Sequence, residues 1–375
     1  MKLTLQIQLL PNAAQSIFLR ETLARFNETA NWLSVKAFDL RSANKVKLQQ
    51  LFYKDVRAKF GLSAQMTVRC IAQVCEAYKR DRKKLPKFRK YASMPFDQRM
   101  MSFKGVDRVS LLTLQGRVIV PFVMGAYQRE RFTNAKGQCD LVLRKDGKWF
   151  LLVTVDLPDK TLTPVTDFIG VDLGVIRLAT TSDGAHFSGD AVESVRERYH
   201  ERRQTLQHAA SRRKAKGKRP KAIRRALRRT KSRESNFRKH ENHVISKQLV
   251  ELATGTKRGI ALEDLTHIRQ RTRFRKKQRA KMSGWSFSQL RTFIAYKLQL
   301  AGVNLVLVDP RNTSRTCAEC GHCEKANRKS QSEFVCRSCG HADNADENAA
   351  RNIRLRAIGF VSNQMFSEKL HSIAA

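Results

Sequence analysis

The stretch GVDLGV, residues 170–175, places a single aspartate, Asp172, inside an apolar run that has the composition of a β-strand. Burying a carboxylate in such a strand costs several kcal/mol unless a partner compensates its charge. Asp172 therefore either points to solvent or helps to hold a cation. The acids that lie near it in the fold decide between the two.

Two further acids stand at the ends of predicted elements. Glu263 ends the apolar strand GIALEDL, where Asp264 competes with it for any role, and Asp346 precedes the helical pattern NAARNIRLRAI. Singly, Glu263 suits a surface charge at a strand end and Asp346 suits a helix N-cap. Together with Asp172, they offer hard oxygen ligands for two Mg²⁺ ions about 4 Å apart, with Mn²⁺ as a substitute. Such a pair activates water and stabilises charge on a scissile phosphate.

A repeated cysteine pattern, CxxCGH, predicts a zinc site. Its two copies supply Cys317, Cys320, Cys336 and Cys339, and fifteen residues separate Cys320 from Cys336. Four thiolates at this spacing can surround one tetrahedral Zn²⁺, and the glycine after each pair lets the backbone turn. A closed site of four sulfurs has no open position, so this zinc would be structural.

Three other residues of the cysteine region are expected to stay outside the zinc site. Cys323 also has CxxC spacing from Cys320, but the repeated hexapeptide leaves it out. His322 and His341 occupy equivalent places in the two copies and are interpreted as bystanders.

The charge of the chain points to a polyanionic partner. The 375 residues include 73 Lys or Arg against 33 Asp or Glu, a formal net charge of +40, with a pI of about 10.6. Such an excess favours nucleic acids, which bind by counterion release. The apolar runs VIVPFVMGAY and FLLVTVDLP are too short to span a membrane. The first residues, MKLTLQIQLLP, alternate like a strand and do not have the pattern of a signal peptide, so we expect a cytoplasmic protein with reduced cysteines.

Two basic tracts predict where nucleic acid binds. Residues 191–240 hold 19 Lys or Arg and four Glu, and residues 267–282 hold eight basic residues and no acid. Solvated helix surface is the alternative explanation. Because both tracts lie inside the chain, they favour the wall of a channel that follows phosphates. Arg271, Arg273 and Arg275 are the predicted contacts, with Phe274 and Trp285 available for stacking on bases.

Hydrophobic periodicity divides the chain into two kinds of structure. Residues 2–9 alternate as one strand, a helical region follows from Pro11, and residues 105–157 contain two β-hairpin patterns. These strands would close a small antiparallel barrel of oligonucleotide-binding type, with the helices inserted after its first strand. From residue 167 onward, strands and helices mix in the order of an α/β sheet covered by helices.

The motifs together resemble the TnpB family, the OrfB-type transposon-encoded RNA-guided nucleases related to type V CRISPR effectors. The resemblance covers residues 1 to about 355 and is most specific in FIGVDLGV, ALEDL, GWSFSQLRTFIAYKLQLAGV, TSRTCAECGH and CRSCGHADNADENAARNI. The family's split RuvC nuclease carries a catalytic triad on three such motifs, which implies Asp172, Glu263 and Asp346. The matching aspartate stands two residues before Asn348, which excludes Asp343.

The resemblance also implies an architecture. We expect an α/β RNase H-like (RuvC) nuclease domain with an inserted zinc finger, and an OB-like antiparallel β-barrel (the wedge) that carries an inserted helical recognition domain. The expected bounds are wedge 1–10 and 105–165, recognition domain 11–104, nuclease 166–312 and 342–358, zinc finger 313–341, and C-terminal tail 359–375.

The implied function is that of an RNA-guided DNA endonuclease. It would bind a guide RNA from the transposon end, read a short motif beside a double-stranded DNA target, and hydrolyse phosphodiester bonds with Mg²⁺. Gln65, Lys79 and Arg80 are candidate contacts to the RNA or to the adjacent motif. We expect a monomer on one RNA, associated with the nucleoid in a prokaryotic cytoplasm.

Two other functions stay open. A guided DNA-binding regulator would use the same fold without cleavage, although the intact set of acids favours cleavage. A transposase that joins DNA covalently needs a His-x-His pair and a nucleophilic tyrosine, and no two of the nine histidines stand two residues apart. A transposase with three carboxylates would not need the double cysteine pattern between its second and third acids.

Overall fold

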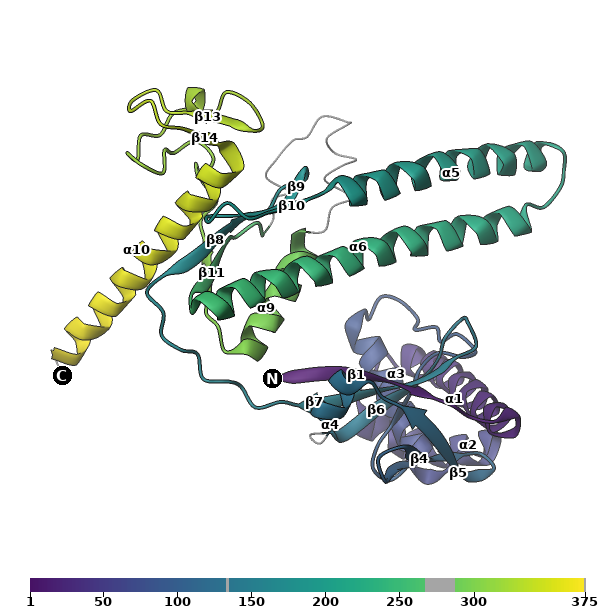
Figure 1. The fold of residues 1–375 in the computed structure, drawn as a ribbon. Coiled ribbons are helices and arrows are strands. Elements are labelled where there is room, and N and C mark those ends of the chain that lie inside the picture. Colours follow the sequence, from purple (N-terminus) through teal and green to yellow (C-terminus); the bar gives the residue numbers. More distant parts are fainter. Residues whose placement is uncertain (133–134, 267–286, 374–375) are drawn as a thin grey trace. The chain divides into compact units, whose positions relative to one another are not determined.

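The chain forms two compact units, residues 1–158 and 159–375 (Figure 1). The computed structural model describes residues 1–132, 135–266 and 287–373. Within these ranges, no helix combines the length and apolar character that crossing a membrane requires. Each unit has its own hydrophobic core, so each is described by itself.

The first unit is built on a seven-stranded antiparallel sheet in the order β2-β6-β7-β1-β5-β4-β3. Its strands are β1 (Lys2–Leu9), β2 (Met94–Phe96), β3 (Met101–Lys104), β4 (Arg108–Thr113), β5 (Gly116–Val123), β6 (Ala135–Leu143) and β7 (Trp149–Asp156). The two edge strands, β2 and β3, follow one another in the chain after only residues 97–100, so the two edges of the sheet must come close together. The sulfur atoms of Cys139 and Met101 accordingly lie 3.0 Å apart across this opening. The expected antiparallel barrel is therefore present in near-closed form.

Helices of the first unit follow its first strand, as predicted. They are α1 (Ala13–Asp39), α2 (Lys45–Phe60), α3 (Ala64–Arg80) and, later in the chain, α4 (Ala126–Phe132). Apolar residues of α1 and α3 pack in the same core as the inward side chains of β1. The long helices end at Arg80, whereas residues 94–96 and 101–104, within the expected helical stretch 11–104, are strands of the sheet.

The second unit contains a five-stranded mixed sheet in the order β10-β9-β8-β11-β12. Its strands are β8 (Phe168–Asp172), β9 (Arg177–Thr181), β10 (His186–Ser188), β11 (Gly259–Glu263) and β12 (Leu305–Val308). β8, β11 and β12 are parallel, and β9 and β10 run antiparallel to their neighbours. The first strand of the unit is therefore central, and its carboxyl end lies beside that of β11.

Helices cover both faces of this sheet. The helices of the unit are α5 (Asp190–Ala215), α6 (Lys221–Thr256), α9 (Phe287–Ala301) and α10 (Ala345–Ile373). Ile169 and Val171 of β8 pack with α6 and α9, and the alternate residue Phe168 packs with α10. Both faces of β8 are therefore buried, which explains its continuous apolar sequence. α10 continues through most of the expected tail, residues 359–375.

The cysteine region forms a small module between β12 and α10. It contains the short helix η1 (Lys325–Asn327) and a two-stranded antiparallel sheet of β13 (Glu333–Val335) and β14 (Ala342–Asn344). Phe334 is fully buried and packs with Cys317, Cys336 and Ala345. This tiny core joins the module to the first residue of α10.

Candidate metal centres and nucleic-acid surface

Three acids from distant parts of the chain meet at one edge of the mixed sheet. In the parallel pairing of β8 and β11, Val171 lies opposite Leu262, so the next residues in this register are Asp172 and Glu263. The third acid, Asp346, lies in the first turn of α10. Strand register thus brings the first two together, and the docking of α10 decides whether the third joins them.

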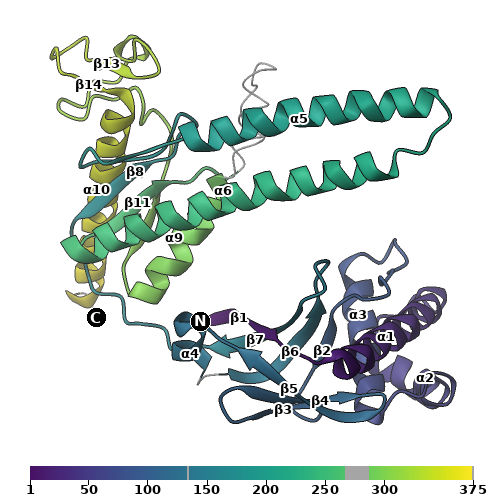
Figure 2. The same ribbon diagram turned by 45° about the vertical axis from the view of Figure 1, so that its right-hand side comes forward.

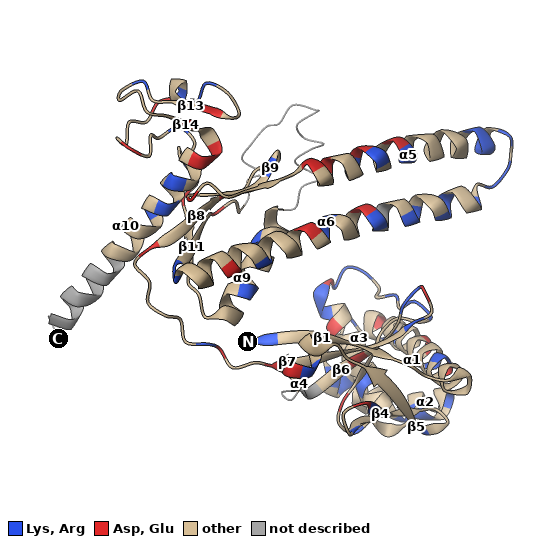
Figure 3. Ribbon diagram, in the orientation of Figure 1, with Lys and Arg blue, Asp and Glu red and all other residues tan. Residues whose placement is uncertain are grey.

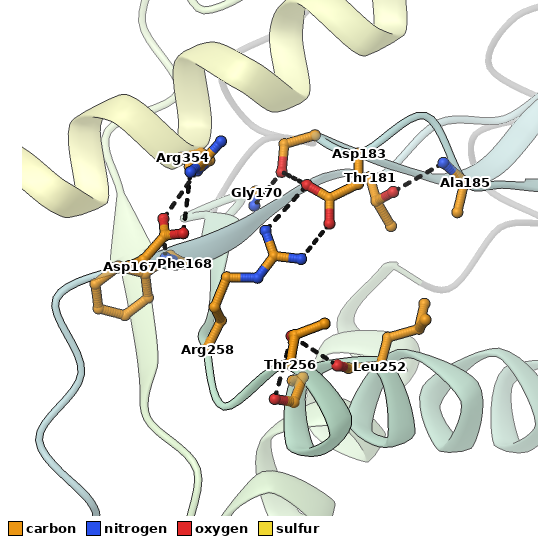
Figure 4. Close-up of polar contacts among 12 residues, drawn as sticks. Asp167, Phe168, Gly170, Thr181, Asp183, Ala185, Leu252, Thr256, Arg258 and Arg354 are labelled. Atoms are coloured by element: carbon orange, nitrogen blue, oxygen red, sulfur yellow. Dashed lines mark hydrogen bonds and ion pairs between the residues drawn. The ribbon is translucent and has the colours of Figure 1, made fainter.

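The docking of α10 on β8 aligns the helix antiparallel to the strand. Asp167, just before β8, receives two hydrogen bonds of 2.9 and 3.0 Å from Arg354 (Figure 4). Further along the strand, Gly170 approaches Ala350 so closely that an added Cβ would lie 2.0 Å from the Ala350 carbonyl oxygen. Continuing two residues along the strand and one turn back along the helix leads to Asp172 and Asp346. Gly170 is therefore required for the approach of these two acids.

A second ion pair ties the ends of the neighbouring strands (Figure 4). Arg258, which precedes β11, donates to both carboxylate oxygens of Asp183 in the turn after β9. The neighbouring Ser182 hydroxyl donates to Asp183 and accepts from the Gly170 amide at 3.2 Å. These bonds hold β8, β9 and β11 in one arrangement at the end opposite the acids.

Electrostatic interactions indicate that Glu263 and Asp346 both lie near Asp172, although among the described residues only the four cysteines form a group of three or more ligands within 4.8 Å of one another. Burial, followed by repulsion from Glu263 and Asp346, raises the pKa of Asp172 to about 8. Burial also raises the pKa values of Glu263 and Asp346, against nearby guanidinium groups that lower them. The cost of assembling these charges is what a divalent cation would remove. Hard carboxylate oxygens are also the ligands that Mg²⁺ prefers, so the residues fit such an ion.

Two side chains at this edge were not predicted from the sequence. The Thr313 hydroxyl donates to Glu263 Oε1. Arg328, which follows η1 in the cysteine module, donates through Nη2 to Asp346 Oδ1 at 3.3 Å. Thr313 opens the motif TSRTCAECGH, although nothing in the motif assigned it a role, whereas Arg328 lies outside the quoted motifs, so only the fold could have revealed it. By contrast, Asp264, the sequence competitor of Glu263, pairs with Arg291 at 2.7 Å and is half exposed.

The four predicted zinc ligands converge. Among the described residues, their sulfur atoms form a cluster in which all lie within 4.8 Å of one another. The Cys317 and Cys339 sulfurs are 3.7 Å apart, and the Cys320 and Cys336 sulfurs are 3.6 Å apart. A tetrahedral Zn²⁺ with Zn–S bonds of about 2.3 Å requires sulfur separations of about 3.8 Å. The residues therefore fit a zinc ion in geometry and in chemistry.

The two cysteine loops are copies of one backbone structure. In the first loop, the Cys317 amide donates to the His322 carbonyl and the Gly321 amide donates to the Cys317 carbonyl. The Cys336, Gly340 and His341 positions repeat both bonds, and the two glycines have φ values of 76° and 75°. The Cys339 amide donates to the Cys336 sulfur and lowers the pKa of that thiol to about 6.

The expected bystanders lie outside the sulfur cluster. Cys323 is exposed and is not one of the four clustered cysteines. The His322 ring approaches Glu324 at 3.3 Å, and the His341 ring lies 3.8 Å from Asp343. Asp343, which the family motif excluded from the triad, pairs with Arg351 at 3.1 Å.

Buried asparagines connect the cysteine module to α10. Asn348 donates to the Thr316 carbonyl at 2.8 Å and accepts from the Ala318 amide at 3.0 Å. One turn later, Asn352 donates to the carbonyls of Thr313 and Thr316 at 2.9 and 2.7 Å. The segment that these asparagines bind carries both Thr313, which contacts Glu263, and Cys317. The acid edge and the sulfur cluster therefore share one supporting helix.

The predicted nucleic-acid contacts have different surroundings. Gln65 on α3 donates to Asp97 and accepts from Arg99 at 3.4 Å. Lys79 pairs with Glu76 at 3.1 Å, and Arg80 is exposed at the end of the same helix. Arg271, Arg273 and Arg275, with Phe274 and Trp285, lie outside the described residues.

The first basic tract forms a long antiparallel hairpin of α5 and α6 (Figure 2). Residues 202–233, on both sides of its tip, contain 15 Lys or Arg and no Asp or Glu, and the blue segments of Figure 3 mark this charge. A cleft of about 310 Å³ lies between the two helices. Tyr199 and Thr230 line it together with four arginines, which are Arg202, Arg225, Arg229 and Arg233. Such an arrangement suits phosphate groups.

Two family models match the chain, and both lie mostly in the second unit. A model described as a probable transposase matches residues 151–269, and a model described as Cas12f1-like, TNB domain, matches residues 287–353. Each of these segments contains part of the acid edge, and the second contains the four clustered cysteines.

The predicted kinship with the TnpB family is confirmed. A TnpB-like protein of Methanocaldococcus jannaschii is 24% identical over 241 residues, which cover 59% of this chain and 81% of that relative. A CRISPR-associated endodeoxyribonuclease Cas12f1 of Sulfoacidibacillus thermotolerans is 33% identical over 223 residues, which cover 56% of this chain and 51% of the relative. The chain thus spans about half the length of the Cas12f1 relatives it matches.

The fold has a counterpart among solved structures. The structure of the mini-RNA-guided endonuclease CRISPR-Cas_phi3 matches with a TM-score of 0.55 at 10% sequence identity, covering 96% of this chain and 92% of that one. At this identity the likeness concerns the fold alone.

Proposed function

We propose that this TnpB-type chain is an RNA-guided DNA endonuclease. The observation that carries the proposal is the meeting of Asp172, Glu263 and Asp346 at one edge of the mixed sheet, where their repulsion calls for divalent cations. The names of the relatives, an endodeoxyribonuclease and a TnpB-like protein, support the same chemistry. The five-stranded order with β8 at its centre supports an RNase H-like, RuvC-type nuclease domain.

The three acids would hold two Mg²⁺ ions, which activate water and stabilise the developing charge of a phosphodiester when bound. The chain supplies the positioning. β8 and β11 fix Asp172 and Glu263 through backbone register, and the Thr313 hydroxyl orients the Glu263 carboxylate. The three acids are half-buried, and the lower polarity of their surroundings strengthens the field of these charges. The four cysteines would hold a structural Zn²⁺ in a zinc-finger module with no open ligand position.

The basic hairpin would bind the guide RNA or its duplex with DNA. Residues 202–233 contain no Asp or Glu, so few carboxylates are available to pair with the Lys and Arg side chains there. Phosphate groups of RNA would provide the negative partners. The first unit would be the OB-like wedge with its inserted recognition helices, where Gln65, Lys79 and Arg80 remain proposed contacts to RNA or to the target-adjacent motif. Base pairing with the RNA would supply the remaining specificity, with one chain acting on one RNA.

Cleavage and guide binding can be tested together. The protein is expressed with the flanking transposon-end DNA, the RNA that co-purifies is sequenced, and plasmids carrying the matching target with randomised flanking bases are incubated with Mg²⁺. We expect cleavage of plasmids with one short flanking motif and none with EDTA. A chain that binds the target in the presence of Mg²⁺ and leaves it uncut would instead be a guided regulator.

The hairpin has its own test with a matched control. Arg225→Gln with Arg229→Gln removes two cleft charges, whereas Lys247→Gln removes an exposed charge of α6 that pairs with Glu251. For each phosphate that the protein no longer neutralises, the slope of log affinity against log salt should fall by about one. Unchanged RNA affinity and slope in the double variant would assign this tract to ordinary solvated surface.

A DNA-joining transposase is the second candidate, because the family model over residues 151–269 is described as a probable transposase. It predicts joined products between transposon-end and target DNA. Incubating both DNAs with the protein and sequencing the products distinguishes joining from simple cleavage.

A further inference from the structure

We infer that Arg328 is an internal counter-cation of the acid site, which competes with divalent metal and makes the metal affinity of that site depend on the cysteine module. The inference rests on the proposed role of the three acids as metal ligands. It assigns Arg328 a positioning role, separate from any contact with nucleic acid.

The hydrogen bond between Arg328 and Asp346 is weak enough for a divalent cation to replace it. Its guanidinium reaches Asp346 through a single nitrogen at 3.3 Å, whereas a full Arg–carboxylate pair uses two shorter bonds. The Arg328 side chain is 25% exposed and that of Asp346 only 13% exposed. A divalent cation offers Asp346 a stronger partner, and the guanidinium would keep its bonds to the Ser330 and Gln331 carbonyls.

The same guanidinium acts on the whole acid site. Its charge lowers the pKa values of Asp172, Glu263 and Asp346, against the burial that raises them. One positive charge thus offsets part of the mutual repulsion of three acids when no metal is bound. Because the charge stays near the site when metal enters, it must also repel that metal.

The cysteine module holds Arg328 in place. Arg328 donates to the carbonyls of Ser330 and Gln331, and its backbone forms a bridge with Phe334, the buried centre of the module. The preceding residue, Asn327, is fully buried, donates to the His322 carbonyl at 3.1 Å and accepts from the Arg337 amide at 2.9 Å. Asn327 therefore contacts both cysteine loops, and the position of Arg328 depends on their closure.

A merely structural role predicts the opposite result. If Arg328 only braces its loop and Asp346, its loss should loosen the acid site and weaken metal binding. If it competes with metal, its loss should strengthen metal binding. The direction of the change therefore separates the two explanations.

The test measures Mn²⁺ binding to the full-length chain freed of RNA, by electron paramagnetic resonance of free Mn²⁺. Arg328→Gln removes the charge, Arg328→Lys keeps it, and Lys329→Gln removes the neighbouring charge, which pairs with Glu333 at 3.6 Å. We expect Mn²⁺ affinity to rise on the order of tenfold in Arg328→Gln. The Arg328→Lys and Lys329→Gln variants should stay within about twofold of wild type, because the exposed pair of Lys329 is worth little.

A second variant tests the dependence on the module. Asn327→Ala keeps the Arg328 charge but removes the bonds to both cysteine loops, so Mn²⁺ affinity should rise to a value between wild type and Arg328→Gln. Bound zinc and circular dichroism are measured on every variant. Equal or weaker Mn²⁺ binding in a folded Arg328→Gln protein overturns the inference. If wild type binds no Mn²⁺, or if Asp172→Asn leaves Mn²⁺ binding unchanged, the proposed metal site itself is wrong.

Discussion

The sulfur cluster and the acid edge both gather like-charged ligands, but they are assembled in different ways. The four cysteines come from residues 317–339, and two local loops with the same hydrogen bonds bring their sulfurs to within 4.8 Å. The three acids come from residues 172, 263 and 346, and they meet only after a parallel sheet has formed and a helix has docked on it.

The two sites therefore differ in how strongly their ligands repel one another when no metal is bound. Free thiols ordinarily have pKa values of about 8.5 and are mostly neutral at pH 7, so less like-charge repulsion opposes the gathering of cysteines than of carboxylates. The acids are held by strand register and by α10, and burial together with their mutual repulsion raises the pKa of Asp172 to about 8. Arg328, carried by the cysteine module, connects the two sites and supplies part of the missing positive charge at the second.

The largest expected effect concerns cleavage. Asp172→Ala or Glu263→Ala should reduce Mg²⁺-dependent target cleavage by about a thousandfold, which corresponds to several kcal/mol of lost charge stabilisation. RNA binding, measured by filter retention, should stay unchanged because the basic hairpin is untouched. Asp264→Ala is the matched control and should cleave like wild type, since Asp264 pairs with Arg291 outside the site. Wild-type cleavage by the Glu263 variant would remove that acid from the site.

The next effect should appear in the cysteine module. Cys336→Ser should release zinc and destabilise the second unit by several kcal/mol, because zinc-binding free energy is folding free energy in small modules. Cys323→Ser should keep its zinc and its melting temperature. Elemental analysis and thermal unfolding check both variants, and the assignment of ligands is wrong if the Cys323 variant is the one that loses zinc.

A pH dependence should separate the two sites in metal-free protein. The pKa of Asp172 is about 8 in the folded state and about 3.9 when unfolded, so between these values the unfolded state releases the proton first. Stability should therefore fall as pH rises from about 4 to 8, by on the order of a few kcal/mol. Asp172→Asn should flatten this decline in chemical denaturation experiments. An equally steep decline in that variant would show that another group causes it.

The smallest expected effect concerns the helix that joins the sites. Asn352→Ala removes two buried hydrogen bonds to the Thr313 and Thr316 carbonyls and should lower stability by about 1–2 kcal/mol. Asn304→Ala removes a single hydrogen bond, to the Thr163 carbonyl, which is more exposed than those of Asn352. It should therefore lower stability by less. Urea unfolding of both variants provides the comparison. If the two variants lower stability equally, α10 does not depend on the two Asn352 bonds for its contact with the cysteine module.

Much of this protein could be predicted from local sequence. Alternating apolar residues predicted β1, and the repeated CxxCGH pattern predicted the four clustered cysteines and left out Cys323. Such features are visible because their cause lies within a few neighbouring residues: side-chain alternation in a strand, or the backbone turn that a glycine permits. The kinship with TnpB proteins was likewise carried by short contiguous motifs.

Only the tertiary structure decided the surroundings of the acids. The sequence singled out Asp172, Glu263 and Asp346, but the register of β8 with β11 and the close packing of Ala350 on Gly170 brought them together. Arg328 entered the site with no sequence signal, Thr313 stands in a family motif that gave it no role, and the edge strands β2 and β3 appeared where helix was expected. The physical reason is the same in each case. Register, helix docking and sheet closure depend on contacts between residues far apart in the chain, which local periodicity does not encode.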